Sequence, residues 1–249
     1  MSIRVHGIRA VVLLLCFSIV TDCSFAGEEA GGLVTVESGD LPIILTAPHG
    51  GSEAVPGVSP RIGEGVDLFQ SKSDSFTDEL AEKLADAIEA RLGKRPYIVI
   101  ARFHRKYIDA NRPPELAYES GQAKLVYDEY HRAIAAARRE VINRWGAGIL
   151  LDLHGQKAEP QTIFRGTQNG KTARSLENRF GRVALTGEQS LFGRLAQQGF
   201  HVQPAVNSDE PEDARYNGGY TVGTYGSASG GAFDAVQLEL GFSLRTRDV

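Results

Sequence analysis

Short apolar runs that end in polar residues recur along the chain and predict buried strands. The run 41–47, LPIILTA, leads into Pro48-His49-Gly50-Gly51, and the run 148–153, GILLDL, leads into His154-Gly155. Runs of this length, bounded by turn residues, are typical of strands in the interior of a sheet. Further strand-like runs lie at 33–36, 96–101, 162–165, 201–204 and 235–240.

Helical periodicity separates several of these runs. We expect a helix that starts at Ser73 or Asp74 and ends near Arg91, a second over about 122–145, with Leu125 on its inward face, and a third over 188–198. The glycine-rich stretch 216–232 is expected to lack a core element. Strands that alternate with helices predict an α/β fold, a three-layer αβα sandwich with a mostly parallel, mixed central sheet.

The first 26 residues read as a secretory signal peptide. Arg4 and Arg9 precede an apolar core over 10–20, and Ser24-Phe25-Ala26 offers a small-x-small cleavage site. We therefore predict an exported chain, periplasmic or secreted, with one catalytic domain over 27–249. Both cysteines of the sequence lie within 1–26, so a metal in the exported chain would need His, Asp or Glu ligands.

Charge and hydropathy exclude two classes of partner. The chain has a net charge of −4 and no basic run, which argues against nucleic-acid binding. Its longest apolar run is too short to span a bilayer, so no stable membrane insertion is expected after signal removal.

Two strands that each end in His-Gly suggest two imidazoles that share one metal ion. His49 and His154 are the candidate ligands, and two His with one carboxylate form a common catalytic zinc site. The alternative is that each His caps a strand end through backbone hydrogen bonds. The acidic ligand is either Asp74, which could otherwise cap the following helix, or Glu53, in the loop after His49.

Two further groups are candidates for chemistry. The segment 102–112 contains Arg105, Asn111 and Arg112, and arginines beside a metal can bind a substrate carboxylate in bidentate fashion. The alternative is a solvated basic loop. Glu239 lies between Leu238 and Leu240, where it is either an outward-facing strand residue or a general base.

With these residues in place, the chain resembles the N-formylglutamate amidohydrolase family, which is itself similar in fold to zinc carboxypeptidases and aspartoacylases. Short motifs that match the family in order are APHGG (47–51), DSFTDEL (74–80), HRKYIDANRP (104–113), DLHGQ (152–156), GGYT (218–221) and VQLELG (236–241).

The resemblance implies a phosphorylase/hydrolase-like fold and a zinc-dependent amidohydrolase that cleaves the amide of an N-acyl or N-formyl amino acid such as N-formylglutamate. It assigns His49, His154 and Asp74 to the metal. It assigns Asn111 and Arg112, with Arg105, to the substrate carboxylate, and Glu239 to proton transfer. Zinc or an arginine, with Arg105 the candidate, would stabilise the oxyanion. Gly155-Gln156 departs from the family, which usually has Ser after this His.

Two other functions are compatible with the same residues. The chain could be a secreted zinc carboxypeptidase or amidase that acts on peptide or cell-wall fragments. It could also be a metal-free binding protein on the same fold.

Overall fold

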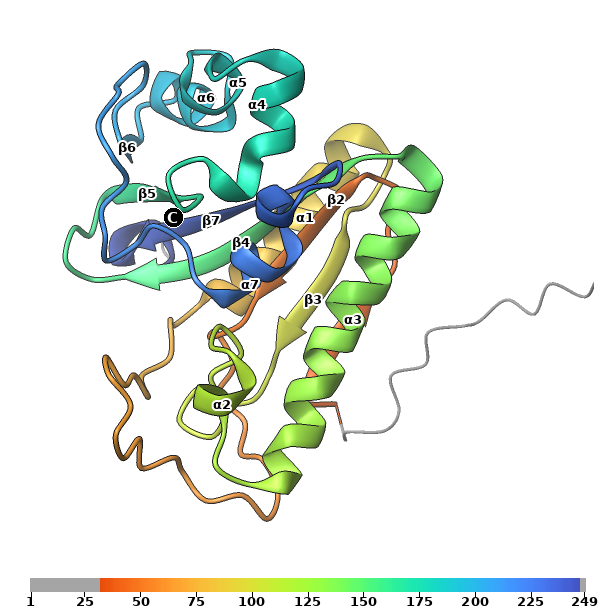
Figure 1. Cartoon of the computed structure of the whole chain (residues 1–249), viewed down its shortest axis with the longest axis vertical. Helices are drawn as coiled ribbons and strands as arrows, with labels where there is room; N and C mark the ends of the chain where they lie inside the picture. The colour runs from red at the N-terminus through yellow and green to blue at the C-terminus, as the bar shows by residue number, and fades with distance from the viewer. Residues whose placement is uncertain (1–31, 247–249) are drawn as a thin grey trace, which may run out of the picture.

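The computed structural model describes residues 32–246, so the predicted signal peptide lies outside the described residues. A seven-stranded sheet with the order β1-β3-β2-β4-β7-β5-β6 forms the centre of the molecule (Figure 1). Its strands are β1 (Val34–Glu37), β2 (Ile43–Ala47), β3 (Tyr97–Ala101), β4 (Gly148–Gln156), β5 (Thr162–Gly166), β6 (His201–Gln203) and β7 (Phe233–Gly241).

The sheet is mixed, with a parallel centre. Strands β3, β2, β4 and β7 run parallel to one another, whereas β1 is antiparallel to β3 and β5 is antiparallel to β7. The helices are α1 (Thr77–Leu92), α2 (Pro114–Ala117), α3 (Gly121–Trp145), α4 (Arg174–Phe180), α5 (Val183–Thr186), α6 (Leu191–Gln197) and α7 (Tyr220–Tyr225).

Helices cover both faces of the sheet and give the predicted three layers. One apolar core joins α3 and α7 to one face, and a second joins α1, α5 and α6 to the other. In Figure 1, α3 passes in front of the sheet and α1 lies behind it. The fold class predicted from the alternation of strands and helices is confirmed, because each central strand buries both of its faces.

Three local expectations were wrong. Helix α1 begins at Thr77 because Phe76 has a left-handed backbone (φ 70°), so Asp74 is not its N-cap. Leu125 is 66 % exposed, since it lies on the outer side of α3. The glycine-rich stretch 216–232 does contain a core element, because α7 buries Val222 against the α3 layer.

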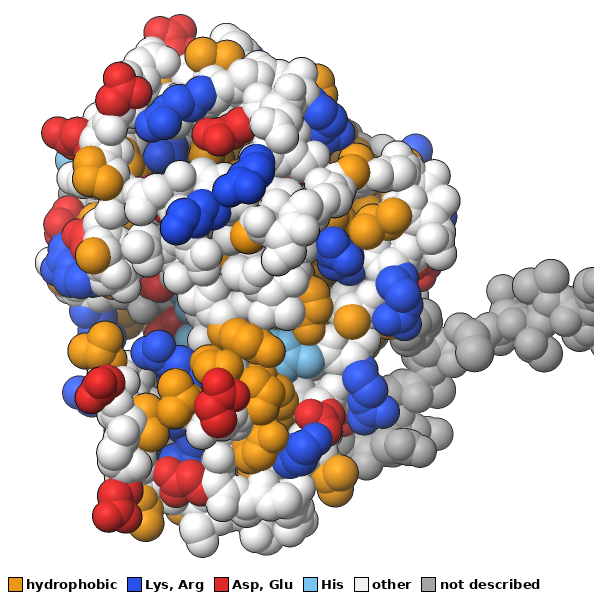
Figure 2. Space-filling view, viewed as in Figure 1, with side chains coloured by type: hydrophobic (Ala, Val, Ile, Leu, Met, Phe, Trp, Pro, Cys, Tyr) orange, Lys and Arg blue, Asp and Glu red, His pale blue; other side chains and the backbone are white. Residues whose placement is uncertain are grey.

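Charged side chains of both signs are interspersed over the visible face of the molecule (Figure 2). Within residues 32–246, no helix is both long and apolar enough to cross a membrane.

Candidate functional site

The parallel strands β2, β4 and β7 bring polar side chains to one edge of the sheet. Asp152 and His154 are two residues apart on β4 and therefore share a face. In the register of the sheet, Asp152 pairs with Gln237 and His154 pairs with Glu239 on β7. These four side chains are all buried, with exposed fractions of 9 % or less.

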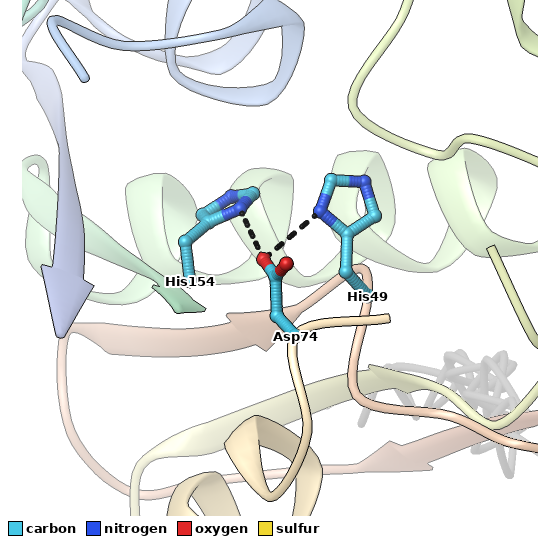
Figure 3. A group of neighbouring side chains, drawn as sticks. All are labelled: His49, Asp74 and His154. Atoms are coloured by element: carbon cyan, nitrogen blue, oxygen red, sulfur yellow. Dashed lines mark hydrogen bonds and ion pairs between the residues drawn. The ribbon is translucent and has the colours of Figure 1, made fainter. Parts of the chain in front are cut away.

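Three side chains from separate segments converge at this edge. Both the Nδ1 atom of His49 and the Nδ1 atom of His154 lie 3.3 Å from the same oxygen, Oδ2 of Asp74. Figure 3 shows the two imidazole rings pointing at the Asp74 carboxylate from either side. One potential ligand atom from each residue lies within 4.8 Å of the others, so these residues form a candidate metal site.

The far nitrogen of each imidazole contacts a second buried carboxylate. His49 Nε2 lies 2.7 Å from Asp109 Oδ1, and His154 Nε2 lies 2.8 Å from Asp152 Oδ2. The Thr46 hydroxyl in turn donates to Asp152 Oδ1 over 2.6 Å. A carboxylate on Nε2 favours the proton at that nitrogen and leaves the Nδ1 lone pair directed at the shared centre, as in carboxylate–histidine–metal triads.

The electrostatics of the cluster favour a cation. Burial alone would raise the pKa of Asp74, but hydrogen bonds and charges from His154 and His49 outweigh it and hold this pKa well below its ordinary value. Burial would lower the pKa of His154, yet Asp152, Asp74 and Glu239 raise it well above its ordinary value. The negative potential that favours a proton on His154 also favours a divalent ion. The donor set of two imidazoles and one carboxylate therefore fits zinc.

Glu239 is buried beside this centre rather than turned to solvent. Its Oε1 atom accepts a hydrogen bond from Gln237 Nε2 over 2.9 Å. Burial raises the pKa of Glu239 to about 7, with Asp74 adding to the increase and His154 opposing it. A carboxyl group with this pKa exchanges protons near neutral pH, as a general acid or base requires.

The three candidates for substrate contact have different surroundings. Arg105 donates Nε and Nη2 to Asp109 Oδ2 over 2.9 and 2.8 Å, and its Nη1 lies 3.8 Å from Asp74 Oδ1. Asn111 is 9 % exposed, and its Oδ1 accepts the backbone N–H of Thr221 while its Nδ2 donates to Gln237 Oε1. Both side chains are thus already engaged by protein groups.

Arg112 is the most accessible of the three. Its side chain is 36 % exposed, and its Nε lies 4.0 Å from Asp109 Oδ2, at the limit of an ion pair. Its guanidinium is therefore the one best placed to meet an incoming anion.

A long loop separates His49 from Asp74. The backbone N–H of Asp74 donates to the carbonyl of His49 over 2.9 Å, which joins the two ends of the loop at the site. Glu53, the other acid considered as a ligand, is exposed on this loop, where its backbone pairs with the segment at Phe103. The structure thus places Asp74 between the two imidazoles and Glu53 apart from them.

Several residues at the site were not assigned a role from the sequence. Asp152 is one of them, although its spacing from His154 on a predicted strand already indicates that the two side chains share a face. Gln237 and Glu239 have the same spacing on the last predicted strand. Thr46 and Arg245 carry no comparable signal, because their contacts depend on strand order and on the packing of the segment after β7.

Residues 41–126 match the model of the N-formylglutamate amidohydrolase family. This match, which includes His49, Asp74 and the 102–112 segment, confirms the predicted resemblance and supports the predicted class, a hydrolase that acts on amide bonds. No curated protein sequence matches the chain.

Two solved structures share the fold. N-formylglutamate amidohydrolase from Ralstonia eutropha JMP134 is 18 % identical, with a TM-score of 0.55 over 86 % of this chain and 89 % of that one. A gene product of Agrobacterium tumefaciens is 14 % identical, with a TM-score of 0.54 over 87 % of each chain. At these identities the likeness concerns the fold alone.

Proposed function

We propose that this protein is a zinc-dependent amidohydrolase that cleaves the amide bond of an N-formyl or N-acyl amino acid. One observation carries the proposal: two imidazoles direct Nδ1 at one carboxylate oxygen, and each is backed at Nε2 by a buried aspartate. This arrangement matches the ligand set of a catalytic zinc site and its outer hydrogen bonds.

His49, Asp74 and His154 would hold the ion. When bound, a zinc ion would supply Lewis-acid polarisation of the substrate carbonyl and increase the acidity of water. His49 and His154 would each present the Nδ1 lone pair to the ion, because Asp109 and Asp152 hold the opposite nitrogen of each ring.

Glu239 would carry the proton. Its carboxylate accepts a proton from the water molecule that attacks the amide carbon, and it returns this proton to the amine nitrogen as the carbon–nitrogen bond breaks. Burial, which raises the pKa of Glu239 to about 7, supports both halves of this transfer. The products are a carboxylic acid and a free amine.

Arginines would recognise the acid half of the substrate. We infer that Arg112 binds a substrate carboxylate, since its guanidinium is partly exposed and weakly paired. Arg105 adds positive charge beside Asp74 and Asp109, where oxyanion charge would develop. Asn111 would act mainly by fixing the segment at Thr221 and Gln237 against the site.

The test combines metal content with a substrate panel. The chain from residue 27 is purified, its zinc content is measured, and hydrolysis of N-formylglutamate is compared with that of N-acetyl amino acids and short peptides with free carboxyl ends. We expect one zinc per chain, a rate that disappears on chelation and returns with zinc, and preference for the formyl or acyl amino acids. Full activity after complete chelation would contradict the proposal.

Export remains part of the proposal. The basic start, apolar core and small-x-small site within residues 1–26 support cleavage after Ala26 and delivery outside the cytoplasm. Mass spectrometry of the protein expressed with its own first 26 residues should find a mature N-terminus at Gly27. An intact N-terminus in the cytoplasmic fraction would contradict this.

A further inference from the structure

Arg245, near the end of the described residues, places its guanidinium against Gly155 and Ser75, the residues that follow His154 and Asp74. The side chain is buried, with 5 % exposed, and donates only to backbone carbonyls among its described hydrogen bonds. Nε donates to Leu240 O over 3.1 Å, Nη2 donates to Gln156 O over 3.3 Å, and Nη1 donates to Ser75 O.

These three carbonyls belong to three different parts of the site. Leu240 follows Glu239 on β7, Gln156 lies two residues after His154 on β4, and Ser75 follows Asp74. One guanidinium therefore cross-links the segments that carry the proposed general base and two of the proposed metal ligands.

Gly155 provides the space for this guanidinium. A Cβ atom at residue 155 would lie 2.2 Å from Arg245 Cζ and 2.5 Å from each of its Nη atoms. Gly155 belongs to strand β4 and has no positive φ, so space rather than backbone conformation requires glycine here. Its backbone N–H also donates to Asp74 Oδ2 over 3.2 Å, the oxygen that both imidazoles face.

We propose that Arg245 is a positioning residue for the metal site, and that Gly155 lacks a side chain because the Arg245 guanidinium occupies the space. Removing the guanidinium takes this donor from three backbone carbonyls, two of them buried, and the segments that end β4 and precede α1 lose their common link. Adding a methyl group at 155 displaces the same guanidinium, because only the long side chain of Arg245 can yield. Both changes should therefore misplace Asp74 in the same way.

The experiment is a double-variant cycle of Arg245→Met and Gly155→Ala, with Arg245→Lys as the conservative variant. Arg138→Met is the matched control, since Arg138 Nε also donates to a backbone carbonyl, that of Tyr225, but its guanidinium lies over Phe233 at the opposite end of β7. Zinc affinity is measured by competition with a chromophoric chelator, and thermal unfolding is measured on the metal-free proteins.

We expect Arg245→Met and Gly155→Ala each to weaken zinc binding by about tenfold or more, as loss of outer support for ligands typically does. The double variant should be no worse than either single variant, in zinc affinity and in unfolding temperature, because both remove the same contact. Arg245→Lys should recover part of the affinity, and Arg138→Met should bind zinc as the unchanged chain does.

Two results would overturn the inference. Additive losses in the metal-free unfolding temperatures would show that the two residues do not compete for one space. Zinc affinity in Arg245→Met equal to that of Arg138→Met would show that Arg245 does not position the ligands. The inference rests on the metal site of the proposed function. If that function is wrong, the unchanged chain will bind no zinc. The unfolding temperatures of the metal-free variants would still show whether Arg245 and a side chain at residue 155 compete for one space.

Discussion

Two histidines of this protein, His154 and the partly buried His131, have opposite charge preferences. Around His154, the carboxylates of Asp152, Asp74 and Glu239 outweigh the effect of burial and raise its pKa well above the ordinary value. His131 lies on α3 among Tyr127, Tyr220 and Tyr225, and burial there lowers its pKa to about 4.

The hydrogen bonds of the two rings explain the contrast. His131 Nε2 lies 3.0 Å from Ala110 O and Nδ1 lies 2.9 Å from the Tyr225 hydroxyl, so both ring nitrogens have uncharged hydrogen-bond partners. Both nitrogens of His154 face carboxylate oxygens, and these negative charges stabilise a positive charge on the ring. Burial alone therefore does not mark a histidine as a ligand; the charge of the groups at its two nitrogens does.

The largest effect should come from removing the histidine among the carboxylates. His154→Ala deletes one proposed ligand and leaves Asp152 and Asp74 buried without it, so zinc binding should be lost and activity should disappear. Metal content after gel filtration measures this. His131→Gln is the matched variant and should retain one zinc per chain; equal zinc content in both variants would remove the distinction between the two sites.

Glu239→Gln should separate proton transfer from metal binding. Glutamine has nearly the same shape but accepts no proton, so kcat should fall by about 100-fold or more while zinc content is unchanged. Steady-state kinetics on the best substrate of the panel, alongside zinc analysis, measure both. A rate near that of the unchanged chain would exclude Glu239 as the proton carrier.

His131 should make stability fall in acid. Its pKa is 6.5 in the unfolded chain and about 4 in the folded protein, so below pH 6.5 the unfolded chain binds a proton that the folded protein does not. Above pH 6.5 this residue should not lower the free energy of unfolding. As the pH falls from 6.5 to 4, it should lower that free energy by about 3 kcal/mol in total.

Urea unfolding of the metal-free protein between pH 7 and pH 4 tests this. His131→Gln should lose that part of the pH dependence, although its stability at pH 7 is lower. Identical slopes for both proteins would show that the aromatic surroundings do not hold His131 neutral.

Asp152→Asn should have the smallest effect of the four. An asparagine can still contact Thr46 and His154, but it lacks the negative charge that fixes the Nε2 proton, so zinc affinity should fall by about tenfold to a hundredfold. Chelator competition measures the change. An affinity unchanged by this substitution would mean that geometry alone, without charge, orients His154.

Much of the sheet could be predicted because each central strand is a short apolar run with its own boundary signals. The polar ends at His49 and His154 followed from the same pattern, since parallel strands end at a common edge. The spacing of Asp152 and His154 already places them on one face of β4. Only the structure shows that Asp152 Oδ2 contacts His154 Nε2.

Other features depend on contacts that local pattern does not encode. The start of α1 is set by the left-handed backbone of Phe76, which is an unusual conformation for a bulky residue. Helix α7 forms in a glycine-rich segment because Thr221 and Val222 are buried against Asn111 and α3. Arg245 reaches three segments that are distant in the chain, and no periodicity predicts such a contact.

The hydrogen bond from Asp74 N to His49 O has a consequence for redesign of this protein. It joins the two ends of the loop, and buried Val55 and Arg61 fix the part between them, since Arg61 donates to the carbonyls of Gln70 and Arg105. Redesign that leaves the reaction centre in place should therefore be confined to the exposed residues near Glu64 and Asp67. This exposed part of the loop is thus the place to graft new recognition elements next to an unaltered reaction centre.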